Sequence, residues 1–511
     1  MRYGFVIDNR KCIGCHACTT ACKSENEVPL GVFRTWVKYT EKGTFPNTRR
    51  YFNVTRCNHC DNAPCITVCP TKALYRRPDG IVDFDSSRCI GCKSCMQACP
   101  YDALYIDPFE HTAAKCNYCA HRVDVGLLPA CVIVCPEKAI IAGDLDDPTS
   151  EIAHLVATQP VAVRKPEQGT QPKLFYIDAD AAALTPEAQT RQDGYLWGEV
   201  RPDDRPKLAV TADGAADPAG EARIAYDVHH PKPWGGKVAT YLWTKSIGSG
   251  AALIAAVLFL AGAVDNRATF QIAAPLIAVL FILATSVLLV ADLKRPERFW
   301  YLLLKPNPRS WLVWGGYILG VFGAVAFLWL VAAAAGLDTA MKVLMALAIP
   351  LALASAGYTA LLFGQAEGRD FWQSHLLLPQ LIAQAIVAGS AALLLFGVAL
   401  GASDHELRVV AVALAVGVVL FAVLLLAELR GAHGNAHVAR TVKLLTAGPY
   451  RPVLLFGVWL LGVVAPLILV AATVLMGPVI VTAAFAASAA LAGLWFYERI
   501  WVSAGQDVPL S

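Results

Sequence analysis

The sequence predicts two parts of different fold class, an α+β domain at the N-terminus and an all-α bundle of eight transmembrane helices at the C-terminus. Two observations support this division. All 16 cysteines of the 511-residue chain lie between Cys12 and Cys135. Hydrophobic residues make up 56% of the chain, and their excess lies after residue 240. We therefore expect an N-terminal domain, a linker or extended segment, and a membrane domain at residues 1–175, 176–238 and 239–511.

The cysteines form four groups of four. In chain order the groups are Cys12, Cys15, Cys18 and Cys22; Cys57, Cys60, Cys65 and Cys69; Cys89, Cys92, Cys95 and Cys99; and Cys116, Cys119, Cys131 and Cys135. The first and third groups have the C-x2-C-x2-C-x3-C spacing of bacterial two-cluster ferredoxins. Each group has the four thiolates that one [4Fe–4S] cluster needs. We expect a duplicated bacterial-ferredoxin domain in which the sixteen cysteines bind the iron of four clusters and carry electrons.

Zinc sites and disulfides are the alternative uses of so many cysteines. Paired C-x2-C groups can bind structural zinc, and an even number of cysteines can form a disulfide framework. Zinc sites rarely add a third cysteine two residues on and a fourth three residues further. The residues before Cys12 contain no secretory signal, which disfavours disulfides. Iron–sulfur ligation is the preferred interpretation.

The spacing also predicts which groups share ligands. In a two-cluster ferredoxin the fourth cysteine of a run binds the other cluster. Three groups end in a repeated Cys-Pro junction followed by a short apolar strand, at Cys69-Pro70, Cys99-Pro100 and Cys135-Pro136. The first group differs, because Lys23 follows Cys22 and a long insertion precedes Cys57. We expect the second group to pair with the third, and the first with the fourth.

Eight segments of the C-terminal part are long and apolar enough to cross a membrane, which needs about 20 residues for a hydrocarbon core of ~30 Å. The expected spans are 244–264, 270–291, 312–335, 341–363, 376–400, 408–428, 453–474 and 478–500. Some connections are short, as around Gly477-Pro478, so neighbouring helices are expected to be antiparallel. The many Gly and Ala residues inside the spans predict close helix packing.

Charge helps to orient this bundle and to exclude one class of partner. The net charge of +3 is too near neutral to indicate a nucleic-acid partner. With eight spans, the N-terminal domain and the loops after even-numbered helices share one side of the membrane. Most Lys and Arg residues from Lys232 onward fall on this side, whereas the other side has Arg267, Lys342 and Arg408. The positive-inside rule therefore predicts that the cluster domain faces the cytoplasm.

Three stretches of the C-terminal part carry a family resemblance. They are Asp292-Leu-Lys-Arg-Pro-Glu-Arg-Phe-Trp300, Lys305-Pro-Asn-Pro-Arg-Ser310 and Ala504-Gly-Gln-Asp-Val-Pro-Leu-Ser511. With them, the residues from about 232 onward resemble the NrfD-type membrane anchor of polysulfide reductases. Residues 1–175 resemble the four-cluster ferredoxin subunits of molybdopterin oxidoreductases such as dimethyl sulfoxide reductase, polysulfide reductase and formate dehydrogenase. These are usually separate subunits, and here they are fused.

The resemblance implies a protein of the bacterial inner (cytoplasmic) membrane that works with a molybdopterin-type catalytic subunit. It also implies electron exchange with a membrane quinone, either menaquinone or ubiquinone. In this family the quinone site lies in the first four-helix bundle near the ferredoxin subunit. Carried over to this sequence, that site corresponds to polar residues at the ferredoxin end of the spans, namely Asp292, Lys245, Tyr358 and Tyr241.

The residues themselves give independent reason to consider this region. Ionisable residues within spans are costly, ~2.5–3.5 kcal/mol at the membrane centre, and they mark functional sites. The spans carry such residues at their ferredoxin ends: Lys245, Asp292 and Glu428. An alternative is that Lys245 snorkels to the surface, Asp292 pairs with Arg295, and the tyrosines form an interfacial belt.

The histidines after the linker indicate that no haem is bound. They are His375, His405, His433 and His437, all in loops or at helix ends, whereas a b-type haem anchor needs axial histidines inside the spans. We interpret His433 and His437 as surface residues.

The middle of the spans contains mainly neutral polar residues, namely Gln380, Gln384, Ser355 and Thr359. These residues do not decide whether the membrane part pumps protons.

The chain has no dinucleotide-binding loop, P-loop or nucleophile motif, so a partner must supply or take the electrons. We expect the electron-transfer and membrane-anchor subunit of a quinone-linked oxidoreductase. The alternatives are the same series of clusters serving a hydrogenase or multihaem cytochrome, and a quinone-coupled proton-translocating module.

Overall fold

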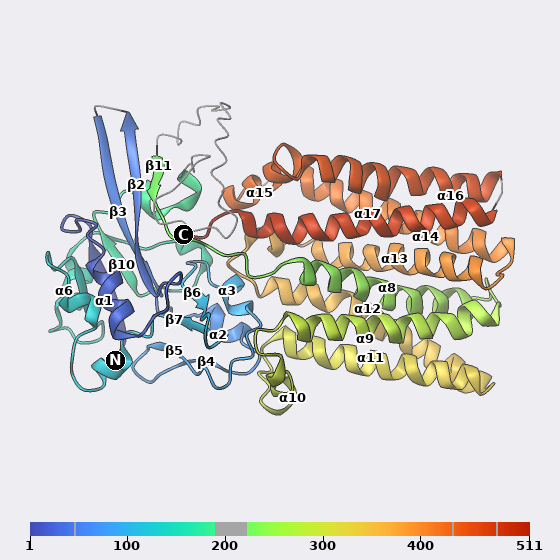
Figure 1. Ribbon diagram of the computed structural model, residues 1–511, viewed down its shortest axis with the longest axis horizontal. Coiled ribbons are helices and arrows are strands. Elements are labelled where there is room, and N and C mark those ends of the chain that lie inside the picture. Colours follow the sequence, from blue (N-terminus) through green and yellow to red (C-terminus); the bar gives the residue numbers. More distant parts are fainter. Residues whose placement is uncertain (45–46, 190–221, 432–433, 477–478) are drawn as a thin grey trace.

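The computed structural model describes residues 1–44, 47–189, 222–431, 434–476 and 479–511. An α+β part and a long helical bundle lie end to end, with the N-terminal residues in the α+β part (Figure 1). This arrangement confirms the two fold classes expected from the sequence.

A four-stranded sheet joins the beginning of the α+β part to its end. Its strand order is β8-β1-β10-β9, formed by β8 (Ile140–Asp144), β1 (Tyr3–Asp8), β10 (Leu174–Ile177) and β9 (Val161–Ala162). Strand β1 is antiparallel to β8 and parallel to β10. Because β1 precedes the first cysteine group and β8 follows the fourth, this pairing brings those two distant groups together.

The second and third cysteine groups belong to two similar units. Each unit has a short helix that ends before a Cys-Pro junction, followed by a β-hairpin. The elements are α2 (Pro64–Val68) with β4 (Leu74–Arg76) and β5 (Val82–Phe84), and α3 (Ser94–Ala98) with β6 (Leu104–Ile106) and β7 (Ala113–Lys115). Helices α2 and α3 pack against each other. The repeated order of elements is the duplication that the cysteine spacing predicted.

The described residues of the expected linker, 176–238, are partly regular structure. Strand β10 crosses the boundary expected at residue 175, and α7 (Ala181–Leu184) follows it. Strand β11 (Ala222–Tyr226) pairs with β2 (Thr35–Thr44), which forms a long hairpin with β3 (Asn47–Arg56). A linker was expected because the stretch Arg201–Arg223 is rich in Ala, Asp, Gly and Pro, and such a composition does not reveal that its last residues pair with a distant edge strand. Apart from Ala222 and Arg223, this stretch lies outside the described residues.

The bundle contains eight helices long and apolar enough to span a membrane, within the described part of the chain. They are α8 (Gly236–Leu260), η3–α9 (Arg267–Asp292), α11 (Trp311–Ala334), α12 (Asp338–Gly364), α13 (Leu377–Ala399), α14 (Asp404–Arg430), η6–α16 (Val453–Leu475) and α17 (Val479–Asp507). All eight expected spans are present. The first begins at Gly236 rather than at 244, and the last continues to Asp507 rather than ending at 500.

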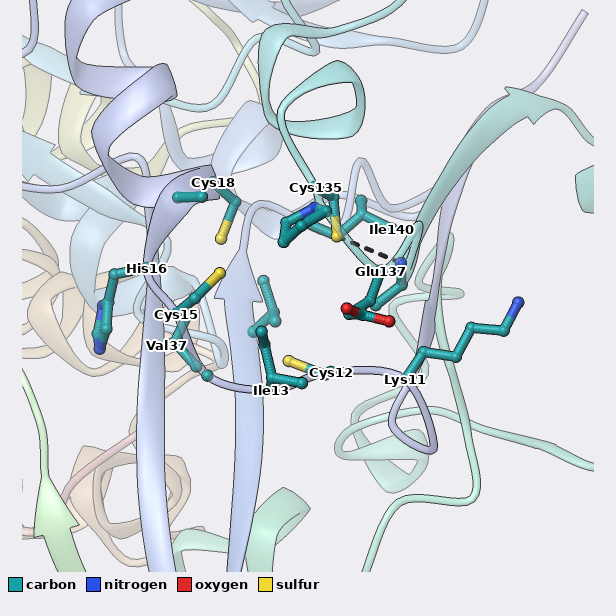
Figure 2. Close-up of a pocket in the computed structure, with 15 residues that line it drawn as sticks. Lys11, Cys12, Ile13, Cys15, His16, Cys18, Val37, Cys135, Glu137 and Ile140 are labelled. Carbon is teal, nitrogen blue, oxygen red and sulfur yellow. Dashed lines mark hydrogen bonds between the residues drawn. The ribbon is translucent and has the colours of Figure 1, made fainter.

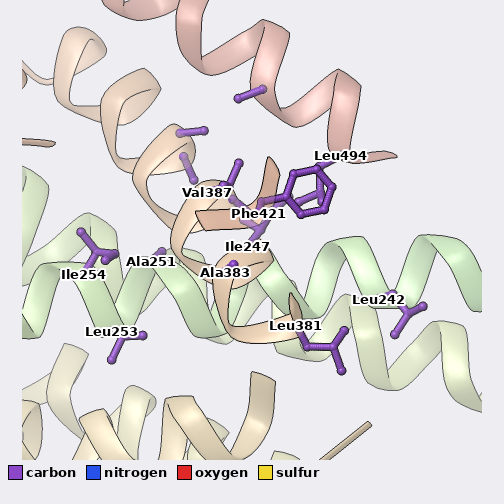
Figure 3. Close-up of a cluster of buried hydrophobic side chains, with 14 of the residues drawn as sticks. Leu242, Ile247, Ala251, Leu253, Ile254, Leu381, Ala383, Val387, Phe421 and Leu494 are labelled. Carbon is purple, nitrogen blue, oxygen red and sulfur yellow. The ribbon is translucent and has the colours of Figure 1, made fainter. Parts of the chain in front are cut away.

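Small residues allow the central helices to approach closely. Helix α8 packs against α9, α12, α13 and α17. Where it crosses α13, a Cβ atom built on Gly250 would lie 1.8 Å from the carbonyl oxygen of Ala385. A Cβ on Gly389 would lie 2.0 Å from the carbonyl carbon of Gly250. Around this crossing, side chains from four helices form the core (Figure 3). Close packing through small residues is the usual basis of helix association in membranes.

One further helix lies outside the spans at the α+β end. Helix α15 (Ala436–Thr446) packs against α17 and η5 (Asp370–Gln373). His437, which we interpreted as a surface residue, is 1% exposed, so that interpretation was wrong. Burial and the nearby charges of Lys165 and Arg369 lower the pKa of His437 to about 3. His433 lies outside the described residues.

Candidate functional site

The sixteen cysteines form no disulfides and gather in four sets. Each set combines three cysteines of one group with the fourth cysteine of another. We name them the outer set (Cys12, Cys15, Cys18, Cys135), the second set (Cys116, Cys119, Cys131, Cys22), the third set (Cys57, Cys60, Cys65, Cys99) and the membrane-side set (Cys89, Cys92, Cys95, Cys69). Figure 2 shows the sulfur atoms of the outer set directed toward one space.

The exchange of fourth cysteines follows the pairing expected from the sequence. The first group exchanges with the fourth, and the second with the third. Short helices produce the exchange. Cys18 and Cys22 lie about one turn apart on helix α1 (Ala17–Glu25), and Cys95 lies on α3, which ends just before Cys99. This turn of helix between the third and fourth cysteines places the fourth sulfur in the neighbouring set.

The chemistry of these sets fits iron–sulfur clusters. Burial raises the pKa of the Cys18 thiol to about 11 and that of the Cys92 thiol to about 12. Four buried thiolates therefore need a bound cationic centre, because metal ligation requires the thiolate. In the described ranges, no three His, Cys, Asp or Glu side chains are placed to hold a single metal ion. The sulfurs of a set surround a space instead of converging on one point.

Backbone amides donate hydrogen bonds to several of the ligand sulfurs. The amide of Ala73 donates to Cys69 Sγ at 3.2 Å, and that of Ala139 donates to Cys135 Sγ at 3.2 Å. Cys89 Sγ accepts from the amide of Gly91 at 3.4 Å. Gly91 has φ +68°, which turns the ligand loop around the sulfurs. Such hydrogen bonds tune the reduction potential of a cluster.

Two buried cations lie between the sets, and the sequence reasoning did not identify them. Arg56 Nη1 donates to Cys131 Sγ at 3.1 Å, and Lys115 Nζ lies 3.6 Å from Cys57 Sγ. Both side chains are fully buried. Burial lowers the pKa of Arg56, but the surrounding cysteine thiolates outweigh that effect and raise it. Each cation directly precedes a ligand cysteine in the sequence, which is the signal that was available.

The membrane-side set lies directly against the bundle. Arg298 Nη1 donates to the carbonyl of Cys89 at 3.0 Å, and Asn307 Nδ2 donates to that of Cys69 at 2.8 Å. The stretches 292–300 and 305–310, which carry the family resemblance, therefore hold the backbone of this set.

Asp292 is the first of the expected quinone-site residues, and it lies at this junction. Its carboxylate accepts a hydrogen bond from Lys93 Nζ at 2.7 Å. Lys93 follows Cys92 and also lines a cavity of about 550 Å³ formed by the α+β part, the segment 228–233 and Lys294. The alternative pairing of Asp292 with Arg295 is wrong, because Arg295 instead forms ion pairs with Glu110 and Glu297.

Lys245, Tyr358 and Tyr241 lie deeper in the bundle. Lys245 is fully buried, and its Nζ donates to the carbonyl of Ala356 at 2.9 Å and to the hydroxyl of Thr359. The same Nζ lies 5.1 Å from the centre of the Tyr358 ring. Tyr358 and Tyr241 are each 4% exposed. Lys245 therefore does not snorkel, and the tyrosines do not form an outward belt.

A buried carboxylate that we did not predict completes this region. Glu498 of α17 is 1% exposed and lies within electrostatic range of Lys245 and Tyr241. We expected the last span to end at residue 500, which placed Glu498 at the membrane edge beside Arg499. Because α17 continues to Asp507, Glu498 lies more than two turns inside the helix.

The stretch 504–511 connects the two parts of the protein. Gln506 Oε1 accepts from Gln97 Nε2 at 2.6 Å. Arg369 Nη1 donates to the carbonyl of Val508 at 3.0 Å. This stretch thus has a docking role.

Family models match both parts of the chain. Models of the 4Fe-4S dicluster domain match residues 11–73 and 48–145, and the model of polysulphide reductase NrfD matches residues 227–508. A tetrathionate reductase subunit of Salmonella typhimurium is 47% identical over 204 residues, 39% of this chain and 81% of that protein. A polysulfide reductase subunit of Wolinella succinogenes is 45% identical over 181 residues, 34% of this chain and 94% of that protein.

A third relative is a putative dimethyl sulfoxide reductase iron-sulfur subunit of Halobacterium salinarum. It is 37% identical over 245 residues, 42% of this chain and 92% of that protein. These similarities agree with the cysteine sets and the eight-helix bundle. The protein belongs to the polysulphide reductase NrfD family, with its NrfD part fused to an iron–sulfur electron-transfer part of the 4Fe-4S dicluster type.

Proposed function

We propose that this protein passes electrons between a molybdopterin catalytic partner and membrane quinone, as the membrane-anchor subunit of an oxidoreductase. The sixteen cysteines bind four [4Fe–4S] clusters. The observation that carries the proposal is the position of the membrane-side set, whose backbone is held by bundle residues beside Asp292.

The four sets form a continuous series. Cys18 of the outer set lies within electrostatic range of Cys131, and Cys116 of the second set lies within range of Cys57. Cys95 of the membrane-side set is likewise within range of Cys65 in the third set. Electrons therefore have neighbouring sites from the surface of the α+β part to the membrane.

The outer set marks the docking site of the catalytic partner. Cys15 is exposed, so this end of the series reaches the surface. Apolar side chains next to its ligand cysteines in the sequence are exposed: Ile13 at 55%, Ile133 at 59% and Val134 at 40%. Clustered exposed apolar residues are typical of protein interaction sites. The three relatives described above are named as subunits of reductases, which favours a reductase catalytic subunit as the occupant.

The opposite end of the series supplies the quinone chemistry. Reduction of a quinone to a quinol consumes two electrons and two protons. Lys245 and Tyr358 are buried donors that can hydrogen-bond a quinone carbonyl oxygen, and Asp292 lies between them and the membrane-side set. We assign the quinone site, for menaquinone or ubiquinone, to Asp292, Lys245, Tyr358 and Tyr241.

The cluster domain is assigned to the cytoplasmic face of a bacterial inner membrane. The connections at the α+β end carry many basic residues, whereas the opposite end carries few. The α+β end has 14 Lys and Arg residues from Lys232 onward, among them Lys294, Arg298 and Arg430, whereas the other end has Arg267, Lys342 and Arg408. The positive-inside rule supports this orientation.

Purification in a mild detergent with its partners tests the proposal. We expect a large subunit containing molybdenum or tungsten, identified by mass spectrometry and metal analysis. A nickel–iron or multihaem partner would contradict the assigned partner while leaving the electron path in place.

In the same complex, Asp292→Asn is expected to abolish quinone turnover while the clusters remain. Unchanged turnover in this variant would remove Asp292 from the site.

A further inference from the structure

Two buried carboxylates in the bundle have no part in the chemistry described so far. Glu498 of α17 is 1% exposed, and Glu428 of α14 is 7% exposed. In each, the Oε1 atom has no hydrogen-bond partner among the described residues. A carboxylate inside a membrane bundle is costly, and proton relays are among the functions that retain one.

A tyrosine and a glutamine connect the two carboxylates. The Tyr497 side chain lies within electrostatic range of both Glu498 and Glu428, and its hydroxyl accepts a hydrogen bond from Gln380 Nε2 at 2.6 Å. The side chain of Gln380 also lies within reach of Glu428, and its own Oε1 atom has no partner among the described residues. The three helices that carry these residues, α13, α14 and α17, pack against one another.

The two ends of this series have different surroundings. Glu498 lies within electrostatic range of Lys245, which is more than two turns inside α8. Glu428 lies in the last turn of α14, at the α+β end of the bundle. Among the described residues, the titratable groups within electrostatic range of Glu498 include Lys245 and Tyr241 of α8 and Tyr497 of α17, and Tyr497 is also within range of Glu428.

We infer that Glu498, Tyr497, Gln380 and Glu428 form a proton route between the quinone site and the aqueous surface on the cluster side. The inference rests on the proposed quinone chemistry. When a quinone is reduced, two electrons arrive from the membrane-side cluster and two protons arrive by this route. When a quinol is oxidised, both move in the opposite direction, so electrons and protons balance in either case.

The test compares Glu428→Gln and Tyr497→Phe with the matched control Glu406→Gln. Glu406 is a buried carboxylate at the opposite end of the same helix α14, where its oxygens accept from Ser403 and from the backbone amides of Asp265 and Asn266, so its replacement controls for the loss of a buried carboxylate away from the quinone site. Each variant, reconstituted in proteoliposomes with its partner complex, is assayed for quinone turnover and for its pH dependence. Cluster spectra establish that each variant is folded.

We expect Glu428→Gln to lower kcat by about 10²-fold with little change in KM for quinone. Tyr497→Phe should lower kcat to a smaller extent, Glu428→Asp should restore part of it, and Glu406→Gln should match the wild type. Wild-type kcat and pH profile in both Glu428→Gln and Tyr497→Phe would overturn the route. A wild-type protein whose reduced clusters do not react with quinone would instead overturn the proposed function.

Discussion

At the scale of single residues, buried charges explain why this protein can hold four clusters. Arg56 and Lys115 are fully buried, and each contacts a ligand sulfur of a different set. An isolated buried charge is unstable unless it is paired. The negative charge of ligated clusters provides that pairing, so these cations and the cysteine sets stabilise each other.

Arg56 is therefore expected to raise the reduction potential of the clusters beside it. Replacement by methionine removes a positive charge and a hydrogen bond to Cys131 Sγ, so adding an electron becomes less favourable. We expect a more negative midpoint potential for one or two clusters, by tens of millivolts, in an EPR-monitored redox titration. The exposed Arg49→Gln variant of the same hairpin is the control and should show no shift. An unchanged titration in Arg56→Met would contradict the role given to this residue.

Lys245 is expected to be needed for quinone turnover and not for the clusters. Replacement by methionine keeps much of its volume and removes the only Lys or Arg charge that the described bundle places beside Tyr358. We expect quinone turnover to fall by about 10²-fold, with unchanged cluster EPR spectra. Lys237→Met, which alters an exposed lysine in the first turn of the same helix, should retain turnover. Similar losses in both variants would indicate a general effect of charge.

At the scale of elements, the junction between the two parts depends on polar contacts from loops and helix ends. Loops after α9 and before α11 hold the membrane-side set, and the segment between β11 and α8 contacts the α+β part. In that segment His230 lies 2.5 Å from Asp102 and 3.1 Å from Asp227. One protonated histidine thus joins two carboxylates from different parts of the chain.

His230 makes the stability of this junction dependent on pH. Burial lowers its pKa, but Asp227 and Asp102 outweigh that effect and raise it to about 9. Since the folded pKa lies above the ordinary value near 6.5, the stabilisation is fully present below pH 6.5 and is lost as pH rises through about 9. The contribution is at most ~3 kcal/mol. Thermal unfolding should show a Tm that falls between pH 7 and pH 10 in the wild type, with a smaller fall in His230→Asn.

The sequence predicts features that depend on residues close together in the chain, and it does not predict contacts between distant residues. Cysteine spacing predicts the exchanged ligands, because Cys18 and Cys22 lie about one turn apart on the same helix and this turn determines where the fourth sulfur lies. Apolar length predicts the eight spans in the same local way. The Lys93–Asp292 pair and strand β11 join residues far apart in the chain, and no local pattern indicates them. We did not single out Glu498, because polar residues from this position onward led us to end the last span at residue 500, whereas α17 continues to Asp507.

At the scale of the whole molecule, the fusion of the cluster domain to the membrane bundle determines which cluster lies at the membrane and which lies farthest from it. The cluster series runs from the exposed outer set to the membrane-side set against the bundle. The stretch 504–511 returns to the α+β part, where Arg164 Nη2 donates to the carbonyl of Leu510 at 3.0 Å, and it holds the two parts together. In the proposed function, partner docking and quinone chemistry are therefore at opposite ends of the cluster series.

The orientation of this molecule in the membrane gives a further prediction. Leu337 lies in the turn between α11 and α12, at the end away from the clusters, and is 56% exposed. We expect Leu337→Cys to react with a membrane-impermeant maleimide in intact cells, whereas His375→Cys, in a loop at the cluster end, should react only after lysis. The reverse pattern would place the clusters outside the cytoplasm.

The most direct measurement of the central claim is single-turnover mixing of the reduced protein with a quinone under anaerobic conditions. The account predicts sixteen iron atoms per polypeptide, rapid reoxidation of all four clusters by the quinone, and a large slowing of reoxidation in Lys245→Met. Clusters that stay reduced in the presence of quinone, in a protein with its full iron content, would contradict the account.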